Sequence, residues 1–311
     1  MATMNSYDLN GKKLSFANWI SNIVPTDTPF LSMTGKEAIQ NTLFQWQTDV
    51  LKAPDATNAQ LEGESITTFA AHQPTVEQKN YTQILRKLVN VSDSANQLDL
   101  YGRQKELAYQ MEKAAKELKR DLETILLSNQ TKVLGDAATP RKTDCFQALV
   151  AAIDTADTAT GAIVHKKTGT ANSLTEAQLF DLTYNLYLAG SQADIIMYHP
   201  ERASFFASLM ESNAAGMNRL KMFDGMDTKF NKFVSSIVDP LGCEYKLIPN
   251  RFMPKDMVYF FTPEDWTQMV LRAPERIKLD KKGSFEQWMI EMELGLRHRN
   301  PYASGVLELK A

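Results

Sequence analysis

The sequence of 311 residues has little that would build a metal centre or a disulfide framework. It contains two cysteines, Cys145 and Cys243, which lie far apart in the chain. We therefore expect free thiols and a reducing compartment. No histidine has a second histidine or a cysteine at the spacing of metal ligands, so we expect no metal site and no cofactor. The four histidines are His72, His165, His199 and His298.

Long apolar runs and an excess of one charge are also missing. No segment approaches the roughly 18 apolar residues of a membrane span, and the beginning, MATMNSYDLNGKK, lacks the apolar part of a signal peptide. Lysine and arginine number 34 and aspartate and glutamate 37, a net charge of -3. This balance argues against a dedicated nucleic-acid-binding protein. We expect a soluble cytoplasmic protein with no membrane partner.

The common catalytic motifs are absent: the sequence contains no GxGxxG, phosphate loop, GxSxG or HExxH. The most enzyme-like segment is YHPER, residues 198–202, at the end of an expected strand, where α/β folds often bind ligands. An α/β hydrolase-like enzyme is one interpretation. We favour the structural one, in which Tyr198 and His199 end a strand and Pro200 begins a helix. We expect no catalytic residues and no enzyme.

The chain begins with a segment that does not read as a domain core. In residues 1–40, Pro25 and Pro29 exclude a continuous helix. Residues 15–23, SFANWISNI, could form one amphipathic turn, whose aromatic surface would need a cover. We expect an extended arm.

Two strand-like runs follow, at residues 41–51 and about 80–92. In the first, Phe44 and Trp46 alternate with polar residues, and the segment between the runs is polar. Such a hairpin is marginally stable alone in water. We therefore expect a β-ribbon that lies on another surface.

Residues from about 96 to 129 have helical periodicity, with one apolar stripe and one charged face. The stripe includes Met111, Leu118 and Leu122. On the charged face, Glu112–Lys116 and Lys119–Glu123 have the spacing of helical ion pairs. The helix would be roughly 45–50 Å long, half-exposed and lying across a sheet.

The remaining chain alternates helices and strands. A helix is predicted over LTEAQLFDLTYNLYLAG, with Ser173 as its cap and Gly190 at its end. Strands are predicted at the start of ADIIMYHPERASFFASLM and at KFVSSIVD, CEYKLIP, MVYFFT and WTQMVLR. The alternation in SFEQWMIEMELGLRH predicts a long strand that returns to pair with the early part of the chain. One of its faces carries Trp288, Ile290, Met292 and Leu294.

The order of these parts, and five local motifs, resemble the podovirus-type major capsid proteins of tailed phages, which have the Hong Kong 97-type fold. The resemblance extends from about Trp19 to Leu309. The motifs are NIVPTDTPF…FQWQTDVL, YTQILRKLVNVSDSANQLDLYGRQKELAYQMEKAAKELKRDLE, ATPRKTDC, LIPNRFMPKDMVYFFTPEDW and MIEMELGLRHRNPYASGVL.

The resemblance implies an α+β fold of five parts. They are an N-terminal arm (1–40), an extended β-ribbon or E-loop (41–92), a peripheral domain with the spine helix (93–173), an axial domain (174–270) and returning strands of the peripheral domain (271–311). Cys145 stands where a small, glycine-like residue would be expected, which leaves the local turn open.

The resemblance also implies a function. The chain would assemble with itself, as hexamers and pentamers, into the icosahedral head shell around double-stranded DNA. Its other partners would be portal and scaffolding proteins, and its inner face would contact DNA without sequence specificity. Assembly would occur in the host cytoplasm, and the product would be the virion capsid. An encapsulin-like compartment is the alternative. Because the chain starts at Met1 and shows no cleavage signal, we expect no large removed segment.

Residues of the arm and ribbon would then contact neighbouring subunits. Lys52, Asn58 and Lys79 are also of the types that crosslink subunits in some relatives, but we expect no crosslink here. The expected interface residues are Phe16, Trp19, Phe30, Phe44, Trp46, Lys52, Asn58 and Lys79.

Overall fold

The computed structural model describes residues 27–60, 62–63, 74–151, 161–168, 174–208 and 234–309. The chain divides into two compact units. The first comprises residues 1–27, 86–118 and 275–291, and the second comprises residues 28–85, 119–274 and 292–311. Four elements contribute residues to both units: β4 (Gln83–Ser92), α3 (Glu106–Leu127), β10 (Trp266–Lys278) and β11 (Phe285–His298). Each unit is described separately.

In the first unit, the predicted helix over residues 96–129 is interrupted. A short helix, α2 (Asp93–Gln97), comes first, and α3 begins only at Glu106, after a turn at Tyr101–Gly102. The Asn96 side chain accepts a hydrogen bond from the Leu107 N–H at 3.4 Å and so helps to cap α3. The helix has 22 residues and is therefore about 33 Å long, shorter than predicted.

The predicted apolar stripe of α3 is confirmed. Of the two ion pairs predicted on its charged face, one is confirmed and the other is wrong. Lys116 and Glu112 form the expected exposed ion pair, with 2.6 Å between Nζ and Oε1. Glu123, expected to face solvent with Lys119, is instead fully buried. Its carboxylate has hydrogen-bond partners from distant segments, as shown below. The buried stripe comprises Met111, Ala114 and Leu118 in the first unit and Leu122 and Leu126 in the second.

A four-stranded sheet has the order β1-β10-β11-β4, where β1 is Gly35–Ala38. The predicted return of the last long strand, β11, to an early strand, β4, is confirmed. Ile290, Met292 and Leu294 are buried as expected. Glu291 and Glu293, which alternate with these residues along the strand, are buried as well, and each pairs with arginine side chains.

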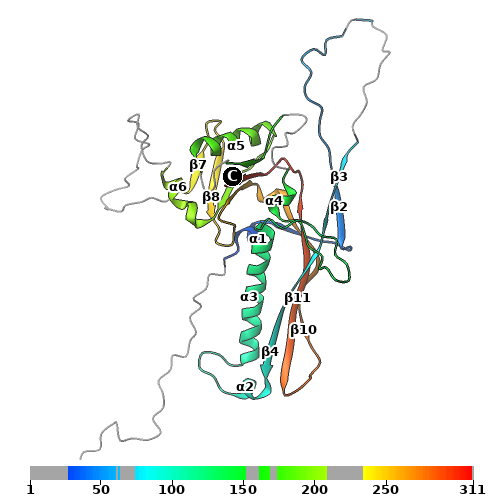
Figure 1. Cartoon of the computed structure of the whole chain (residues 1–311), viewed down its shortest axis with the longest axis vertical. Helices are drawn as coiled ribbons and strands as arrows, with labels where there is room; N and C mark the ends of the chain where they lie inside the picture. Colours follow the sequence, from blue (N-terminus) through cyan, green and yellow to red (C-terminus); the bar gives the residue numbers. More distant parts are fainter. Residues whose placement is uncertain are drawn as a thin grey trace, which may run out of the picture. The chain divides into compact units, whose positions relative to one another are not determined.

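The second unit contains a six-stranded sheet of order β5-β12-β9-β6-β8-β7 (Figure 1). Every residue of the central strand β9 is buried. The last strand, β12, was expected with the returning strands of the peripheral domain, but it pairs with β9 and β5. The strands are β5 (His165–Lys167), β6 (Ile195–Tyr198), β7 (Ser236–Val238), β8 (Glu244–Pro249), β9 (Met257–Phe261) and β12 (Gly305–Glu308).

The helix α5 (Glu176–Leu188) contacts β12 of this sheet. Its predicted cap is corrected: Thr175 caps the helix in a reciprocal pair with Gln178, whereas Ser173 lies outside the described residues. The helix ends before Gly190, as predicted. The other short helical elements are α1 (Pro29–Met33), α4 (Phe146–Leu149), α6 (Ala203–Ser208) and the two 3-10 turns η2 (Pro200–Arg202) and η3 (Pro263–Asp265).

An aromatic cluster forms the core of the second unit. Phe146 stacks on Trp266 at 4.1 Å and on Tyr259 at 4.3 Å between ring centroids, and Trp266 stacks on His298 at 4.1 Å. Phe30 packs edge-on against this cluster. Since all five rings are buried, they contribute much of the apolar burial that stabilises the unit. None of the described helices is long and apolar enough to cross a membrane.

Candidate assembly surface

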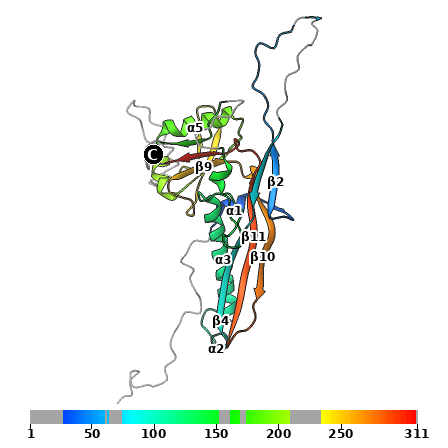
Figure 2. The ribbon, with the colours of Figure 1, turned by 45° about the vertical axis from the view of Figure 1, so that its right-hand side comes forward.

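The predicted β-ribbon is present, with a different strand pairing. Strand β2 (Leu43–Thr48) runs antiparallel to β3 (Val76–Tyr81), and the two form a ribbon (Figure 1 and Figure 2). In their register Thr48 lies opposite Val76. The predicted partner over residues 80–92 is divided at Thr82, and its larger part, β4, joins the four-stranded sheet. The ribbon therefore consists of two strands only, and most of the described residues beyond them are exposed.

The two aromatic residues predicted on the ribbon lie at its base. Phe44 is buried and stacks on Trp46, which is half-buried. The Phe44 ring lies directly against Gly295 of β11, where an added Cβ would stand 2.6 Å from a ring atom. Phe44 therefore packs the ribbon onto its own subunit, and glycine at position 295 permits this close approach.

The other predicted interface residues fall into three groups. Lys52, Asn58 and Lys79 are exposed, as an intermolecular contact requires. Phe16 and Trp19 lie outside the described residues. Phe30 is fully buried in the aromatic cluster, so its side chain packs within its own subunit and it is removed from the set.

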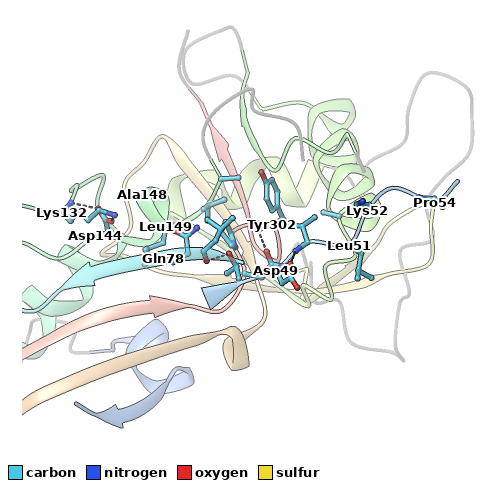
Figure 3. A pocket seen from close by; sticks show the side chains of 18 residues that line it. Asp49, Leu51, Lys52, Pro54, Gln78, Lys132, Asp144, Ala148, Leu149 and Tyr302 are labelled. Carbon is cyan, nitrogen blue, oxygen red and sulfur yellow. Dashed lines mark hydrogen bonds and ion pairs between the residues drawn. The ribbon is translucent and has the colours of Figure 1, made fainter. Parts of the chain in front are cut away.

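A pocket of about 840 Å³ lies at the foot of the ribbon (Figure 3). One wall is the chain leaving β2, and the opposite wall comes from the end of α4 and from the turn that precedes β12. At its edge, Lys132 Nζ pairs with Asp144 Oδ2 at 3.0 Å. Its apolar lining includes Val50, Leu51, Val76, Leu149, Pro301 and Tyr302.

Some of the apolar side chains that line this pocket remain uncovered. Leu51 is 87% exposed and Val76 is 53% exposed. A second exposed group, Tyr184, Tyr187 and Leu188, lies on one face of α5. Exposed apolar groups of this kind are typical of protein contact surfaces, and tyrosine is enriched in such contacts.

The YHPER segment has the structural role that we favoured. Tyr198 ends β6 and its ring packs on Phe206 at 4.5 Å. His199 Nδ1 accepts a hydrogen bond from the Glu201 N–H and caps the turn that Pro200 begins. Burial lowers the pKa of His199. The residues that make these interactions therefore stabilise the local fold.

Both cysteines are free; Cys145 is buried and Cys243 is partly exposed. Within the described ranges, no group of three or more histidine, cysteine, aspartate or glutamate side chains could hold a metal. Cys145 is buried just before α4 in extended backbone, so the position does not require glycine. Burial raises the pKa of the Cys145 thiol to about 11, which keeps it protonated and unreactive.

The buried carboxylate of Glu123 was missed by the sequence analysis. Its two oxygens accept hydrogen bonds from the Phe30 and Leu31 N–H groups, both at 2.9 Å, and it also accepts one from Asn250 Nδ2 at 2.7 Å. Glu123 thereby caps α1, whose own cap residue, Thr28, makes no side-chain bond to it. Desolvation raises the pKa of Glu123, while the hydrogen bonds from Leu31 and Phe30 oppose the rise.

No local signal could have revealed this role. The bonded residues are separated from Glu123 by 92 to 127 positions in the chain, and the spacing to Lys119 favours a surface ion pair equally well.

Comparisons with known proteins agree with a contact-forming subunit. The family model described as the SU10 major capsid protein matches residues 3–311. A curated "Major capsid protein" of Escherichia phage Phieco32 is 52% identical over 339 aligned residues, covering 97% of this chain and 95% of that protein.

Solved structures share the fold at low sequence identity. The capsid of a native GTA particle has a TM-score of 0.68 at 13% identity and covers 98% of both chains. A protein of Mycobacterium phage Adephagia has a TM-score of 0.60 at 10% identity, covering 99% of this chain and 98% of that one. The SrpI encapsulin of Synechococcus elongatus has a TM-score of 0.59 at 11% identity, covering 100% of this chain and 96% of that one.

Proposed function

The chain belongs to the SU10 major capsid protein family, and we propose that its subunits close into the icosahedral head shell of a tailed phage, as hexamers and pentamers with the Hong Kong 97-type fold. The observation that carries this proposal is the β2–β3 ribbon. Two strands alone are marginally stable in water, and the apolar side chains at their foot are uncovered. Contacts with further copies would cover them, and repeated heterologous contacts of this kind can close into a shell.

The parts of the chain fit the roles proposed for them. The ribbon with the polar segment between its strands is the E-loop, α3 is the spine helix, and the four-stranded sheet belongs to the peripheral domain. The six-stranded sheet with α5 is the axial domain, and β12 moves into it from the peripheral segment because it pairs with β9. The arm is proposed to end at Thr28, where Glu123 fixes α1.

The remaining partners are proposals from the same function. A head shell needs a portal and scaffolding proteins during assembly, and we place this assembly in the host cytoplasm. The net charge of -3 suits a shell that encloses double-stranded DNA without binding it tightly, because a strongly basic inner surface would hold the polyanion.

An encapsulin-like compartment is the second candidate, and the similarity of fold to the SrpI encapsulin is what favours it. The 52% identity to a phage major capsid protein favours the head shell instead. The contents of particles isolated from infected cells separate the two: DNA supports the head shell, and a protein cargo without DNA contradicts it.

The proposal is tested by shortening the ribbon. Removal of residues 53–75, with a short Gly-Ser link, should leave a folded subunit, since the flanking β2–β3 ladder is retained. We expect shells of the unaltered chain and only unclosed oligomers of the shortened chain, by sedimentation and electron microscopy.

A matched control replaces the same segment with Gly and Ser at its full length. If this variant also fails to close shells, the sequence of the segment makes the contact; if it closes them, length alone is needed. Full shell formation by the shortened chain would contradict the proposed role of the ribbon.

A further inference from the structure

The joint between the ribbon and the sheet is held by buried charge. At Thr82 the chain passes from β3 of the ribbon to β4 of the four-stranded sheet, and this residue belongs to neither strand. Thr82 is fully buried. Its hydroxyl donates to Glu293 Oε1 at 2.7 Å, and its N–H donates to the carbonyl of Thr42, just before β2, at 2.9 Å. Both strands of the ribbon are thus held at its base.

Two arginines complete the joint. Arg141 Nε donates to the Thr82 carbonyl at 2.7 Å, and the same guanidinium pairs with Glu293. Arg272 of β10 pairs with the other carboxylate oxygen of Glu293 at 3.0 Å. The side chain of Glu293 is only 5% exposed. Charge-assisted hydrogen bonds between planar groups in such a site are strong and directional.

The loop that carries Arg141 is itself fixed. Val133 and Lys142 exchange backbone hydrogen bonds at 3.1 Å, which closes the loop. Gly135 adopts a positive φ of 77°, and a Cβ there would meet the Arg141 backbone at 2.8 Å. Arg141 is therefore presented to Thr82 by a loop conformation that a larger residue would disrupt.

A second set of contacts also holds the end of β3. Asn80 is fully buried. Its side-chain amide donates to the Leu296 carbonyl at 2.7 Å, and its side-chain oxygen accepts from the Asp144 N–H at 2.8 Å. With the contact of Phe44 on Gly295, both strands are fastened to β11 at their base.

We propose that Thr82, Arg141 and Glu293 form a clamp that sets the direction in which the ribbon leaves the subunit, and that shell closure depends on this direction. The dependence of shell closure on this direction rests on the proposed function. Thr82 and the Glu293 carboxylate are buried, whereas the side chains of Arg141 and Arg272 are 24% and 48% exposed. A buried carboxylate that pairs with arginines stabilises a fold less than apolar packing does, and the benefit that it gives here is a fixed geometry. A ribbon held in one direction avoids the entropic cost of ordering it on assembly.

Two mild substitutions test the clamp. Thr82→Val removes the hydroxyl that donates to Glu293 and keeps the shape of the side chain. Glu293→Gln removes the charge that pairs with both arginines. The matched control is Glu291→Gln, two residues earlier on β11, where a buried carboxylate pairs with Arg86 at 2.6 Å.

The direction is measured on the unassembled subunit by pulsed electron spin resonance. Spin labels are placed on Asn58→Cys, beyond the ribbon, and on Cys243, which is partly exposed. Buried Cys145 stays unlabelled. In Thr82→Val and Glu293→Gln, we expect the distance between the two labels to spread over a range about twofold wider than in the unaltered subunit. The reason is that a released joint can rotate about a few backbone torsions. Glu291→Gln should leave the range unchanged.

Shell yield is then measured for the same chains. We expect a several-fold loss for Thr82→Val and Glu293→Gln and none for Glu291→Gln at equal folded concentration. Unchanged distance ranges in both clamp variants, or an equal widening in Glu291→Gln, would overturn the clamp. Widened distances with full shell yield would overturn its role in closure. If even the unaltered chain forms no shells, the proposed function fails, while the distances still decide the clamp.

Discussion

The aromatic cluster around Trp266 and the ribbon differ in how far their tryptophan side chains are buried within the subunit. In the cluster, Trp266 is fully buried, stacks on two rings and donates from Nε1 to Ser304 at 3.0 Å. On the ribbon, Trp46 stacks on Phe44 and stays half-buried, and its indole nitrogen has no hydrogen-bond partner among the residues that the structure describes.

This difference separates two sources of stability. The cluster obtains its burial within one subunit, so it should stabilise the folded chain whether or not shells form. The ribbon has two strands and little burial of its own, so its contribution should come mainly when another copy covers it. Substitutions in the two regions should therefore change different measurements.

The largest expected effect is that of Trp266→Ala. Removing a fully buried indole leaves a cavity among Phe146, His298 and Phe30, and should lower the free energy of unfolding by about 3–5 kcal/mol. Denaturant unfolding of unassembled subunits measures it. Trp46→Ala is the comparison and should cost about 1 kcal/mol, since its ring is only half-buried. Equal costs would remove the distinction between cluster and ribbon.

The helix α3 offers a second comparison, between its two faces. Leu118 is 3% exposed, and Leu118→Ala should cost about 2–5 kcal/mol from lost burial and the cavity left behind. Lys116 is exposed and pairs with Glu112, so Lys116→Glu should cost no more than about 0.5 kcal/mol. The unfolding midpoints of both variants measure the difference. Similar midpoints would mean that α3 has no solvent-exposed face.

The cluster should also give the subunit a dependence on pH. Desolvation lowers the pKa of His298 to about 3, whereas an unfolded histidine has a pKa of about 6.5. Between these values the unfolded chain binds a proton that the folded chain does not. The free energy of unfolding should therefore fall by about 1.4 kcal/mol for each pH unit below 6.5, from this group alone.

His298→Phe isolates this effect, because phenylalanine can retain the stack on Trp266 but cannot titrate. The advantage of the unaltered subunit over the variant should shrink as the pH falls. Parallel pH profiles for the two chains would show that His298 is not buried in its neutral form.

The contrast between the regions also explains what the sequence could predict. The stripe of α3 and the strands β2 and β11 follow from repeats of 3.6 and 2 residues, which are local signals. The buried roles of Glu123 and Glu293 depend on partners far away in the chain, and no spacing marks them. Sequence therefore predicted the ribbon, but neither its joint at Thr82 nor the buried charge that holds it.

The division of the predicted long helix has a similar cause. Leu100 and Tyr101 fit the helical repeat, but the chain forms a bridge between Leu100 and Arg103 and turns there. Arg103 then pairs with Glu106 at the start of α3. These local contacts set the boundary against a weak helical preference, and in the sequence Gly102 signals the turn.

The smallest expected effect on folding belongs to Leu51, beside the pocket at the foot of the ribbon. Because Leu51 is 87% exposed, Leu51→Ser should change the free energy of unfolding by less than about 0.5 kcal/mol. The same variant should form fewer shells, because an apolar group that another copy covers contributes only after contact. Unfolding of subunits and shell yield by sedimentation are measured together, with Leu98→Ser, at another exposed leucine, as the control. If Leu51→Ser closes shells as well as Leu98→Ser, the foot of the ribbon faces solvent in the shell, and the contact lies farther along the ribbon.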